Sequence, residues 1–201
     1  MEPILLILGC QKYKANLLVA MERMKNPAYR LIGLVGGAEE SFDGSLLSLN
    51  VEDSYEFLPR KIQAAFQWIH KNFPETEGIF KTDDDIFFAD QQSLADKIIA
   101  NKTIPYWGVQ IDRTGGGTVE QKRILMGNDK TIRATYLAAI YSYGAGYWIS
   151  KQAIPLVCAS TEHTNAFLED VTMGSIMNRA GYIPRHVQIQ YQERPRINSN
   201  S

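Results

Sequence analysis

Cysteine, long apolar runs and an excess of charge of one sign are all scarce in this sequence. The two cysteines, Cys10 and Cys158, are too few for a disulfide framework, so we expect buried free thiols, as in a reducing compartment. The apolar run at residues 4–8 is too short to span a bilayer and follows no basic segment, so we expect neither a membrane anchor nor a signal peptide. A formal net charge of −1 argues against a nucleic-acid partner or an anionic lipid surface. These absences favour a soluble, cytoplasmic protein.

What the composition does contain is enough apolar material for one globular domain. Hydrophobic residues make up 45% of the chain and charged residues 21%, which is the usual balance for a protein that buries a core. A length of 201 residues suits one domain, and no linker, repeat or low-complexity block divides it. We therefore expect residues 1–201 to form a single domain, with the polar residues 193–201 as a loose tail.

Segments with the apolar pattern of strands alternate along the chain with segments that have the pattern of helices. The segments that predict strands are 3–8, 30–35, 78–81, 105–111, 146–150 and 186–192. Those that predict helices are 14–25, the stretch that begins near Pro59, 91–100 and 169–180. Residues 112–118, which are rich in glycine, predict a mobile loop that serves as a lid. This alternation favours an α/β sandwich with a largely parallel sheet.

Three consecutive carboxylates stand inside an apolar run in the sequence IFKTDDDIFF, residues 79–88. Open α/β sheets bind ligands beyond the carboxyl ends of their strands, which is where these acids would lie. Because side chains alternate along an extended backbone, Asp83 and Asp85 would face one side and Asp84 the other. Oxygen ligands without cysteine suit Mg²⁺ or Mn²⁺, and a diphosphate could complete the shell of the cation. An Asp-rich turn facing water is the alternative, and this stretch alone does not decide between the two.

Four segments, read in order, make a more specific pattern. They are DSYEFLPRK at 53–61, KTDDDIFF at 81–88, YSYGAGYWIS at 141–150 and EDVTMGSIMNRAGYIP at 169–184. In order and approximate spacing they resemble glycosyltransferase family 31, the β-1,3-galactosyltransferase and fringe-related group. The resemblance implies a GT-A fold, a three-layer α/β/α sandwich around a central, largely parallel mixed sheet. It also implies a UDP-sugar donor, Mn²⁺ or Mg²⁺ held at the D-x-D motif, and transfer with inversion at the anomeric carbon.

The resemblance assigns roles to the acidic residues of two of these segments. Asp85 would be the direct metal ligand, Asp83 would bind the donor ribose or the metal, and Asp84 would contact the sugar or a neighbouring basic group. Asp170 would be the base that takes the proton from the acceptor hydroxyl, with Glu169 as second choice. A bound cation would stabilise the charge that develops on the leaving diphosphate. For Glu169 and Asp170 the alternative is structural, since acids favour the first turn of a helix.

Candidates for the rest of the donor site are polar residues near the predicted strand ends. Gln11 and Lys12 follow the first strand, and we expect them to touch uracil or phosphate. Lys61 fits either a nucleotide contact or a solvated position on a helix, and Asp53 is undecided between binding and structure. His186 opens the last predicted strand. Related transferases often complete the metal shell with a late histidine, so His186 is either that ligand or a surface residue.

The predicted function is metal-dependent transfer of a hexose from a UDP-sugar to a hydroxyl of a glycan or glycoprotein. Tyr143 or Trp148 could stack on the acceptor ring, although core packing is favoured for Trp148, while Gly144 and Gly146 would let the backbone approach the sugar. Most eukaryotic relatives carry a membrane anchor and luminal cysteines, so a bacterial enzyme or one from a large DNA virus fits this chain better. Two alternatives remain: a non-catalytic module that binds carbohydrate or nucleotide-sugar, and a metal-dependent nucleotidyltransferase.

Overall fold

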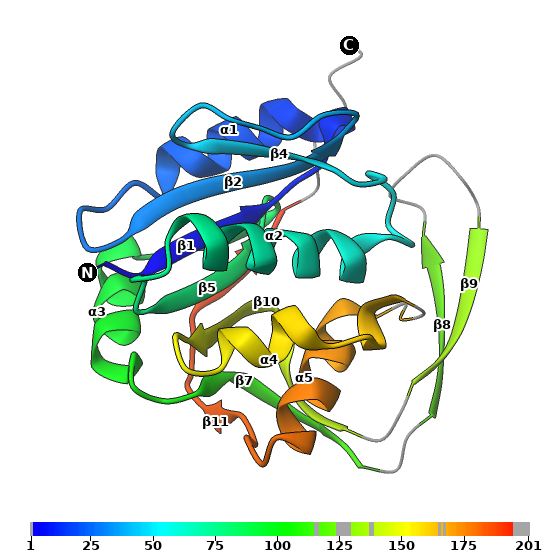
Figure 1. Cartoon of the computed structure of the whole chain (residues 1–201). Coiled ribbons are helices and arrows are strands. Elements are labelled where there is room, and N and C mark those ends of the chain that lie inside the picture. Colours follow the sequence, from blue (N-terminus) through cyan, green and yellow to red (C-terminus); the bar gives the residue numbers. More distant parts are fainter. Residues whose placement is uncertain are drawn as a thin grey trace.

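A central sheet with helices on both faces forms the body of the protein in the computed structural model (Figure 1). The structure describes residues 2–114, 117–123, 130–136, 139–164, 166 and 168–194, with the backbone alone described in 117–123 and 130–136. The large sheet formed by these residues has the strand order β11-β7-β10-β5-β1-β2-β4-β3. Its strands in chain order are β1 (Ile4–Leu8), β2 (Arg30–Gly37), β3 (Ser41–Phe42), β4 (Leu46–Asn50), β5 (Gly78–Asp83), β7 (Tyr106–Arg113), β10 (Ala139–Ser150) and β11 (Arg185–His186).

Most neighbouring strands of this sheet are parallel. The central strand β1 is parallel to both β2 and β5, and β4 is parallel to β2. β10 runs antiparallel to β5 on one side and to β7 on the other, which makes the sheet mixed. Every residue of β1 is buried, as expected for a central strand covered on both faces, and this explains its continuous apolar sequence.

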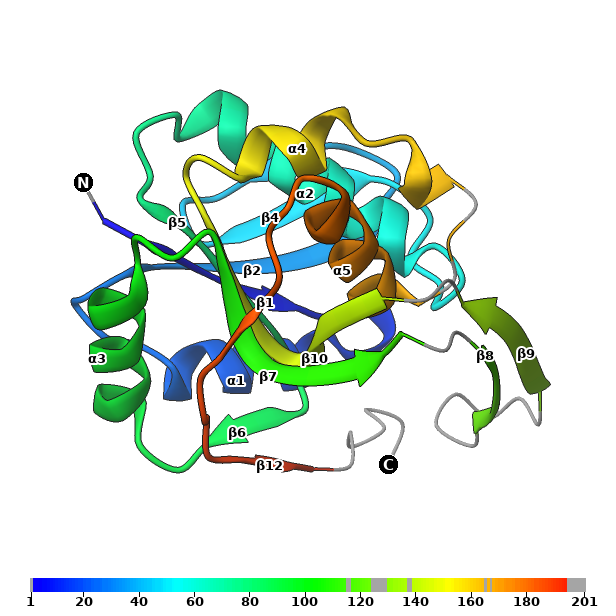
Figure 2. The same cartoon turned by 90° about the horizontal axis from the view of Figure 1, so that it is seen from below.

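Helices cover both faces of the sheet and make three layers. α1 and α3 pack on one face together with Leu5 and Ile7, whereas α2, α4 and α5 pack on the other face together with Leu6 and Leu8 (Figure 2). The bounds are α1 (Lys14–Arg23), α2 (Leu58–Asn72), α3 (Gln91–Asn101), α4 (Ile154–Ala159) and α5 (Glu169–Arg179), with short 3₁₀ helices η1 (Gln11–Tyr13) and η3 (Glu162–Thr164). This is the three-layer α/β/α arrangement that the sequence resemblance implied.

The helix predicted to begin near Pro59 is confirmed as α2. Pro59 lies in its first turn, where a missing N–H costs no intrahelical hydrogen bond. The side chains that carry its predicted apolar face are fully buried against the sheet: Ile62, Ala65, Phe66 and Ile69. Among the described residues, no helix combines the length and apolarity needed to cross a bilayer. Cys10 and Cys158 are both free thiols, as expected, but only Cys10 is buried, whereas Cys158 is partly exposed.

The single strand predicted at 186–192 is wrong. The segment instead forms β11, which pairs with β7, and β12 (Tyr191–Glu193), which pairs antiparallel with β6 (Ile86–Phe88) in a separate two-stranded sheet. Between them, Val187 and Ile189 pack against the core without belonging to a strand. The alternation of apolar residues therefore marked burial along a crossing segment and not pairing in one sheet.

The loop predicted at 112–118 is also wrong over most of its described length. β7 continues to Arg113, and β8 (Gly117–Arg123) begins a hairpin with β9 (Lys130–Tyr136). Residues 115 and 116 lie outside the described residues. Glycine has no side chain beyond hydrogen and adopts many backbone conformations. A glycine-rich stretch therefore does not distinguish the start of this hairpin from a loop.

Candidate active site

A cavity of about 250 Å³ opens at the carboxyl ends of β1 and β5, where an open α/β sheet binds its ligands. The loop after β1 and residues 53–61 line one side of it, and the middle of β10 with the first turn of α5 lines the other. Since β5 lies between β1 and β10 in the sheet, the acids at the end of β5 stand between these two sides.

β10 reaches the cavity through an irregularity in its pairing. Its register shifts between Ser142 and Tyr147, so that one half pairs with β7 and the other half with both β7 and β5. Such a bulge bends a strand and re-aims its side chains. Tyr143, Gly144 and Ala145, which lie in the shifted stretch, all line the cavity.

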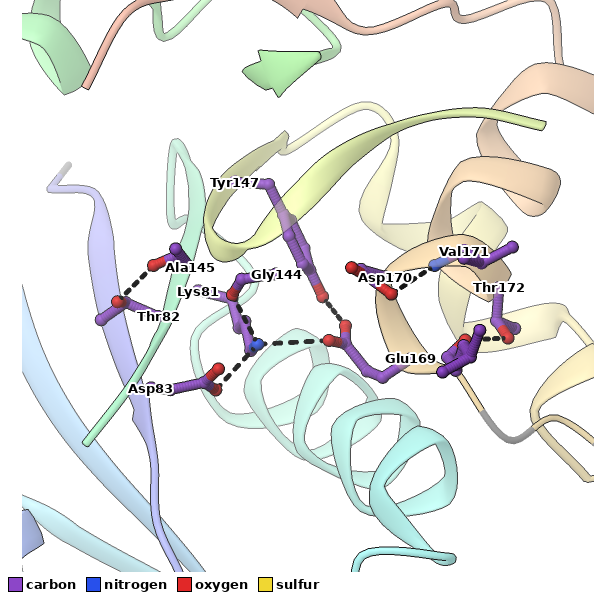
Figure 3. A network of polar contacts seen from close by, with 11 residues as sticks. Lys81, Thr82, Asp83, Gly144, Ala145, Tyr147, Glu169, Asp170, Val171 and Thr172 are labelled. Carbon is purple, nitrogen blue, oxygen red and sulfur yellow. Dashed lines mark hydrogen bonds and ion pairs between the residues drawn. The ribbon is translucent and has the colours of Figure 1, made fainter. Parts of the chain in front are cut away.

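A buried lysine neutralises the acidic stretch. The Lys81 side chain is 1% exposed, and its Nζ lies 2.8 Å from Asp83 Oδ1 and 3.2 Å from Glu169 Oε2 (Figure 3). The same ammonium donates a third hydrogen bond to the carbonyl oxygen of Gly144 at 3.0 Å. Burial alone lowers the pKa of Lys81, but the charges of Asp83 and Glu169 outweigh it and raise that pKa above its ordinary value. Lys81 is therefore a fixed cation that joins β5, β10 and α5.

Sequence reasoning missed Lys81, although a signal was present. In an extended strand, residues two apart point to the same side, so a lysine at 81 falls beside the carboxylate at 83. The three aspartates divide as expected. Asp83 and Asp85 line the cavity, whereas Asp84 is 2% exposed, lies outside the lining and donates its backbone N–H to Leu8 O at 3.0 Å. An Asp-rich turn facing water does not describe this segment, because Asp84 is buried.

The two acids of α5 have different surroundings. Glu169 is 5% exposed, and its carboxylate accepts hydrogen bonds from the Tyr147 hydroxyl and pairs with Lys81 (Figure 3). Asp170 also lines the cavity, and its Oδ1 accepts a hydrogen bond from the N–H of Val171 at 2.9 Å. A Cβ added at Gly144 would lie 3.3 Å from Asp170 Oδ2, so the bare backbone of β10 passes close to this carboxylate.

The protonation of Asp170 is tuned toward neutral pH. Burial raises the pKa of Asp170 from 3.8 to about 6, and the negative charge of Glu169 adds to this rise, while Lys81 opposes it. A carboxylate with such a pKa binds a proton more readily than a solvated one and still ionises at pH 7. Because Glu169 is already paired with a buried cation, Asp170 is the acid of this helix that is suited to accept a proton from a ligand.

The other end of the cavity is held by a second buried ion pair. Lys61 Nζ lies 2.6 Å from Asp53 Oδ1 and donates to Gly9 O at 2.8 Å, with the lysine side chain 2% exposed. The Asp53 carboxylate also accepts the backbone N–H groups of Gly36, at 3.0 Å, and of Gln11. A solvated helix lysine is thus wrong for Lys61. Asp53 and Lys61 both line the cavity and brace the loop after β1.

Besides Asp84, three predicted polar site residues lie outside the cavity lining. The Gln11 and Lys12 side chains are exposed on η1, and the Lys12 ammonium lies 5.3 Å from the ring centroid of Tyr13. His186 is exposed on β11, where its Nδ1 accepts the backbone N–H of Gln110 at 3.3 Å. The structure does not bring His186 to the acids, because β7 and β10 separate β11 from β5 in the sheet.

The donor atoms at the acidic end of the cavity fit a hard divalent cation. Asp83 and Asp85 offer carboxylate oxygens, as Mg²⁺ and Mn²⁺ prefer. Within the described part of the chain, no group of three or more His, Cys, Asp or Glu side chains is placed to hold a metal. A cation here would take the rest of its ligands from water and from the phosphates of a substrate, as Mg²⁺ sites commonly do.

Comparison with known proteins gives a family and distant relatives. A family model described as "Galactosyltransferase" matches residues 34–188. Two relatives are lactosylceramide 1,3-N-acetyl-beta-D-glucosaminyltransferases, one from Xenopus tropicalis and form A from Xenopus laevis. Each is 24% identical over 144 residues, covering 70% of this chain and 38% of the relative. The chain thus spans well under half the length of these relatives.

Solved structures share the fold at low sequence identity. The chain is similar to 4-diphosphocytidyl-2C-methyl-D-erythritol synthase, with a TM-score of 0.55, 12% identity, and coverage of 100% of this chain and 93% of that one. It is also similar to CMP:2-keto-3-deoxy-manno-octonic acid synthetase complexed with CTP, with a TM-score of 0.54, 10% identity, and coverage of 98% and 93%. These likenesses concern the fold alone, and they confirm the expected GT-A type of α/β/α sandwich.

Proposed function

This chain belongs to the galactosyltransferase family, of the glycosyltransferase family 31 type, and from that premise we propose that it moves a hexose from a UDP-sugar to a hydroxyl of a glycan or glycoprotein acceptor. The observation that carries the proposal is the placement of Asp83, Asp85 and Asp170 on the walls of one cavity at the carboxyl ends of β1 and β5. Asp83 and Asp85 suit a cation that in turn binds a diphosphate, and Asp170 suits a proton. Inverting transfer needs both kinds of group.

The order of the strands supports one orientation of the donor. The diphosphate would lie at Asp83 and Asp85, with the nucleoside toward the loop after β1 that Asp53 and Lys61 brace. The sugar would then lie toward β10 and Asp170. Mn²⁺ or Mg²⁺ held by Asp85 with Asp83 would supply Lewis-acid stabilisation of the leaving diphosphate.

Asp170 would act on the side of the sugar away from the diphosphate. Its carboxylate takes the proton of the acceptor hydroxyl as that oxygen attacks the anomeric carbon. Lys81 and Tyr147 hold the Glu169 carboxylate beside it, and the negative charge of Glu169 adds to the raised pKa of Asp170. The backbone of Gly144 leaves room for the reacting groups, since a side chain there would approach the carboxylate.

Metal-supported binding of UDP tests the donor site directly. We expect Mn²⁺ to strengthen UDP binding to the wild-type protein, and Asp85→Asn to weaken that binding by at least about tenfold, because a neutral amide holds a hard cation poorly. Isothermal titration with UDP, with and without Mn²⁺, measures both effects. Asp96→Asn is the matched control, since Asp96 is an exposed acid on α3 outside the cavity. If neither Mn²⁺ nor Mg²⁺ improved UDP binding to the wild type, the proposed donor site would be refuted.

The activity is expected to depend on pH through Asp170. A general base must be ionised to accept a proton. Burial is the main cause that raises the pKa of Asp170 to about 6, and the charge of Glu169 adds to it. As pH falls below that value, kcat/KM should therefore drop about tenfold per unit. The profile of UDP-sugar consumption from pH 4.5 to 8 measures this. The names of the Xenopus relatives suggest UDP-N-acetylglucosamine with lactose as a first pair to assay. A flat profile across pH 6 would exclude Asp170 as the base.

The same assay separates the alternative functions. A non-catalytic binding module would bind UDP-sugar and leave it intact, whereas a transferase without acceptor hydrolyses its donor slowly. A nucleotidyltransferase would release pyrophosphate from a nucleoside triphosphate and a sugar phosphate. Accumulation of UDP that requires Mn²⁺ supports the transferase over both.

A further inference from the structure

The last described residues of the chain form a strap across the strand that follows the acids. This C-terminal strap, residues 191–194, pairs with β6 through β12, with Glu193 opposite Ile86 (Figure 2). The backbone N–H of Arg194 donates to Asp85 O at 2.9 Å, and the Arg194 guanidinium lies 4.5 Å from the ring centroid of Phe87. Residues 193 and 194, which the sequence placed in a loose tail, are thus fixed beside the acidic stretch.

The strap completes a small aromatic and acidic wall with one residue of β10. The Tyr143 ring is stacked on Tyr191, with centroids 6.2 Å apart and an interplanar angle of 28°. The Tyr143 hydroxyl donates to Glu193 Oε1 at 2.9 Å. Tyr143 is 36% exposed, and both Tyr143 and Glu193 line the cavity. The wall therefore presents an aromatic ring and a carboxylate to a ligand.

The position of this wall indicates which part of the reaction it serves. Tyr143 directly precedes Gly144, whose backbone approaches the Asp170 carboxylate. In the sheet, β10 lies on the opposite side of β5 from β1, where the nucleoside of the donor is placed. A group that contacts Tyr143 would therefore lie beside the base and away from the nucleoside. In an inverting transfer this is where the acceptor enters.

We propose that Tyr143, Tyr191 and Glu193 form the subsite that binds the sugar ring of the acceptor. The proposal rests on the transferase function proposed above. The face of a pyranose ring carries C–H groups that pack on an aromatic side chain, and its hydroxyls donate hydrogen bonds to a carboxylate. Tyrosine offers a large contact area with little conformational entropy to lose, because its stacking on Tyr191 and its bond to Glu193 already fix it.

Binding of simple glycosides tests this subsite without turnover. The probes are methyl β-D-galactopyranoside, methyl β-D-glucopyranoside and lactose, titrated by saturation-transfer NMR into protein that holds UDP and Mn²⁺. We expect Tyr143→Ala and Glu193→Gln each to weaken glycoside binding about tenfold or more, in the range of a lost aromatic contact or a lost hydrogen bond to a charged group. Tyr143→Phe, which keeps the ring, should weaken it less than Tyr143→Ala.

Affinity for UDP distinguishes the acceptor subsite from a donor contact. All three variants should bind UDP with Mn²⁺ within about twofold of the wild type, since none of them removes a donor contact. Glu40→Gln is the matched control, because the Glu40 carboxylate accepts the indole N–H of Trp68 at 3.1 Å outside the cavity. It should change neither affinity.

Three results would overturn the subsite. They are unchanged glycoside binding in both Tyr143→Ala and Glu193→Gln, a loss of UDP binding with glycoside binding kept, and failure of the wild type to bind any of the glycosides. Each of these leaves the proposed transferase standing as long as Mn²⁺ supports UDP binding to the wild type. Absence of that UDP binding would instead contradict the transferase itself.

Discussion

Replacing Asp170 by asparagine is expected to slow glycosyl transfer by about a hundredfold to ten-thousandfold, the usual contribution of a general base. Asparagine keeps the shape of the side chain and its bond to the Val171 N–H, but it cannot take the proton of the acceptor hydroxyl. Binding of UDP with Mn²⁺ should stay within about twofold of the wild type, because the proposed position of the diphosphate is at Asp83 and Asp85 and not at Asp170. Initial rates of UDP release and a UDP titration measure the two effects.

The thermal stability of the Asp170→Asn protein shows whether the substitution disturbs the fold. The folded protein keeps a proton on Asp170 up to about pH 6, whereas the unfolded chain loses it near 3.8, so the stability that this group contributes is lost as pH rises through 6. At pH 7 the neutral asparagine avoids the cost of a buried charge, and the variant should melt no lower than the wild type. Normal turnover by Asp170→Asn would show that another group accepts the proton.

Replacing Lys81 by methionine is expected to lower the free energy of unfolding by about 3–5 kcal/mol, the usual cost of breaking a buried ion pair from one side. Methionine fills a similar volume, but Glu169 would stay buried without its cation, and Asp83 would lose its partner at 2.8 Å. The Gly144 carbonyl would lose a donor as well. Urea denaturation followed by circular dichroism measures the change.

An exposed ion pair provides the comparison for Lys81. Lys151 lies 2.8 Å from Glu75, but its side chain is 49% exposed, so Lys151→Met should cost less than about 1 kcal/mol. Adding Glu169→Gln to Lys81→Met should recover part of the loss, since the amide leaves no unpaired buried charge at position 169. A Lys81→Met protein as stable as the Lys151→Met protein would mean that water reaches Lys81 and that its contacts with Asp83 and Glu169 contribute little to stability.

The fold was largely predictable because the apolar pattern within each central strand and helix shows which of its side chains are buried. Continuous apolar runs marked β1 and β2, and the spacing of Ile62, Ala65 and Phe66 marked the buried face of α2. The failures lie where burial does not follow one strand or helix. The bulge in β10 places Gly144 between two pairing registers, and no periodic pattern spans it. Ile189 is buried and Val187 is partly buried along a segment that leaves one sheet and joins another.

The candidate site was more predictable in its acids than in its cations. Motifs named Asp83, Asp85 and Asp170, and the structure brings the three to one cavity. Lys61 was a candidate for a nucleotide contact, but its ion pair with Asp53 was not foreseen. Lys81 was missed although Asp83 lies two residues away in the same strand, and its second carboxylate partner, Glu169, comes from α5. Glu193 had no motif to mark it, and only the pairing of β12 with β6 places it at the cavity.

The Lys81 ammonium has a consequence for the order in which the protein can mature during synthesis. Its acceptors come from residues 83, 144 and 169, so a ribosome-bound chain that has reached only β5 carries the lysine with a single carboxylate partner. The second carboxylate arrives only when α5 has been made. A nascent or truncated chain that stops before Glu169 therefore leaves Lys81 with one carboxylate partner and the cavity without the wall that α5 contributes.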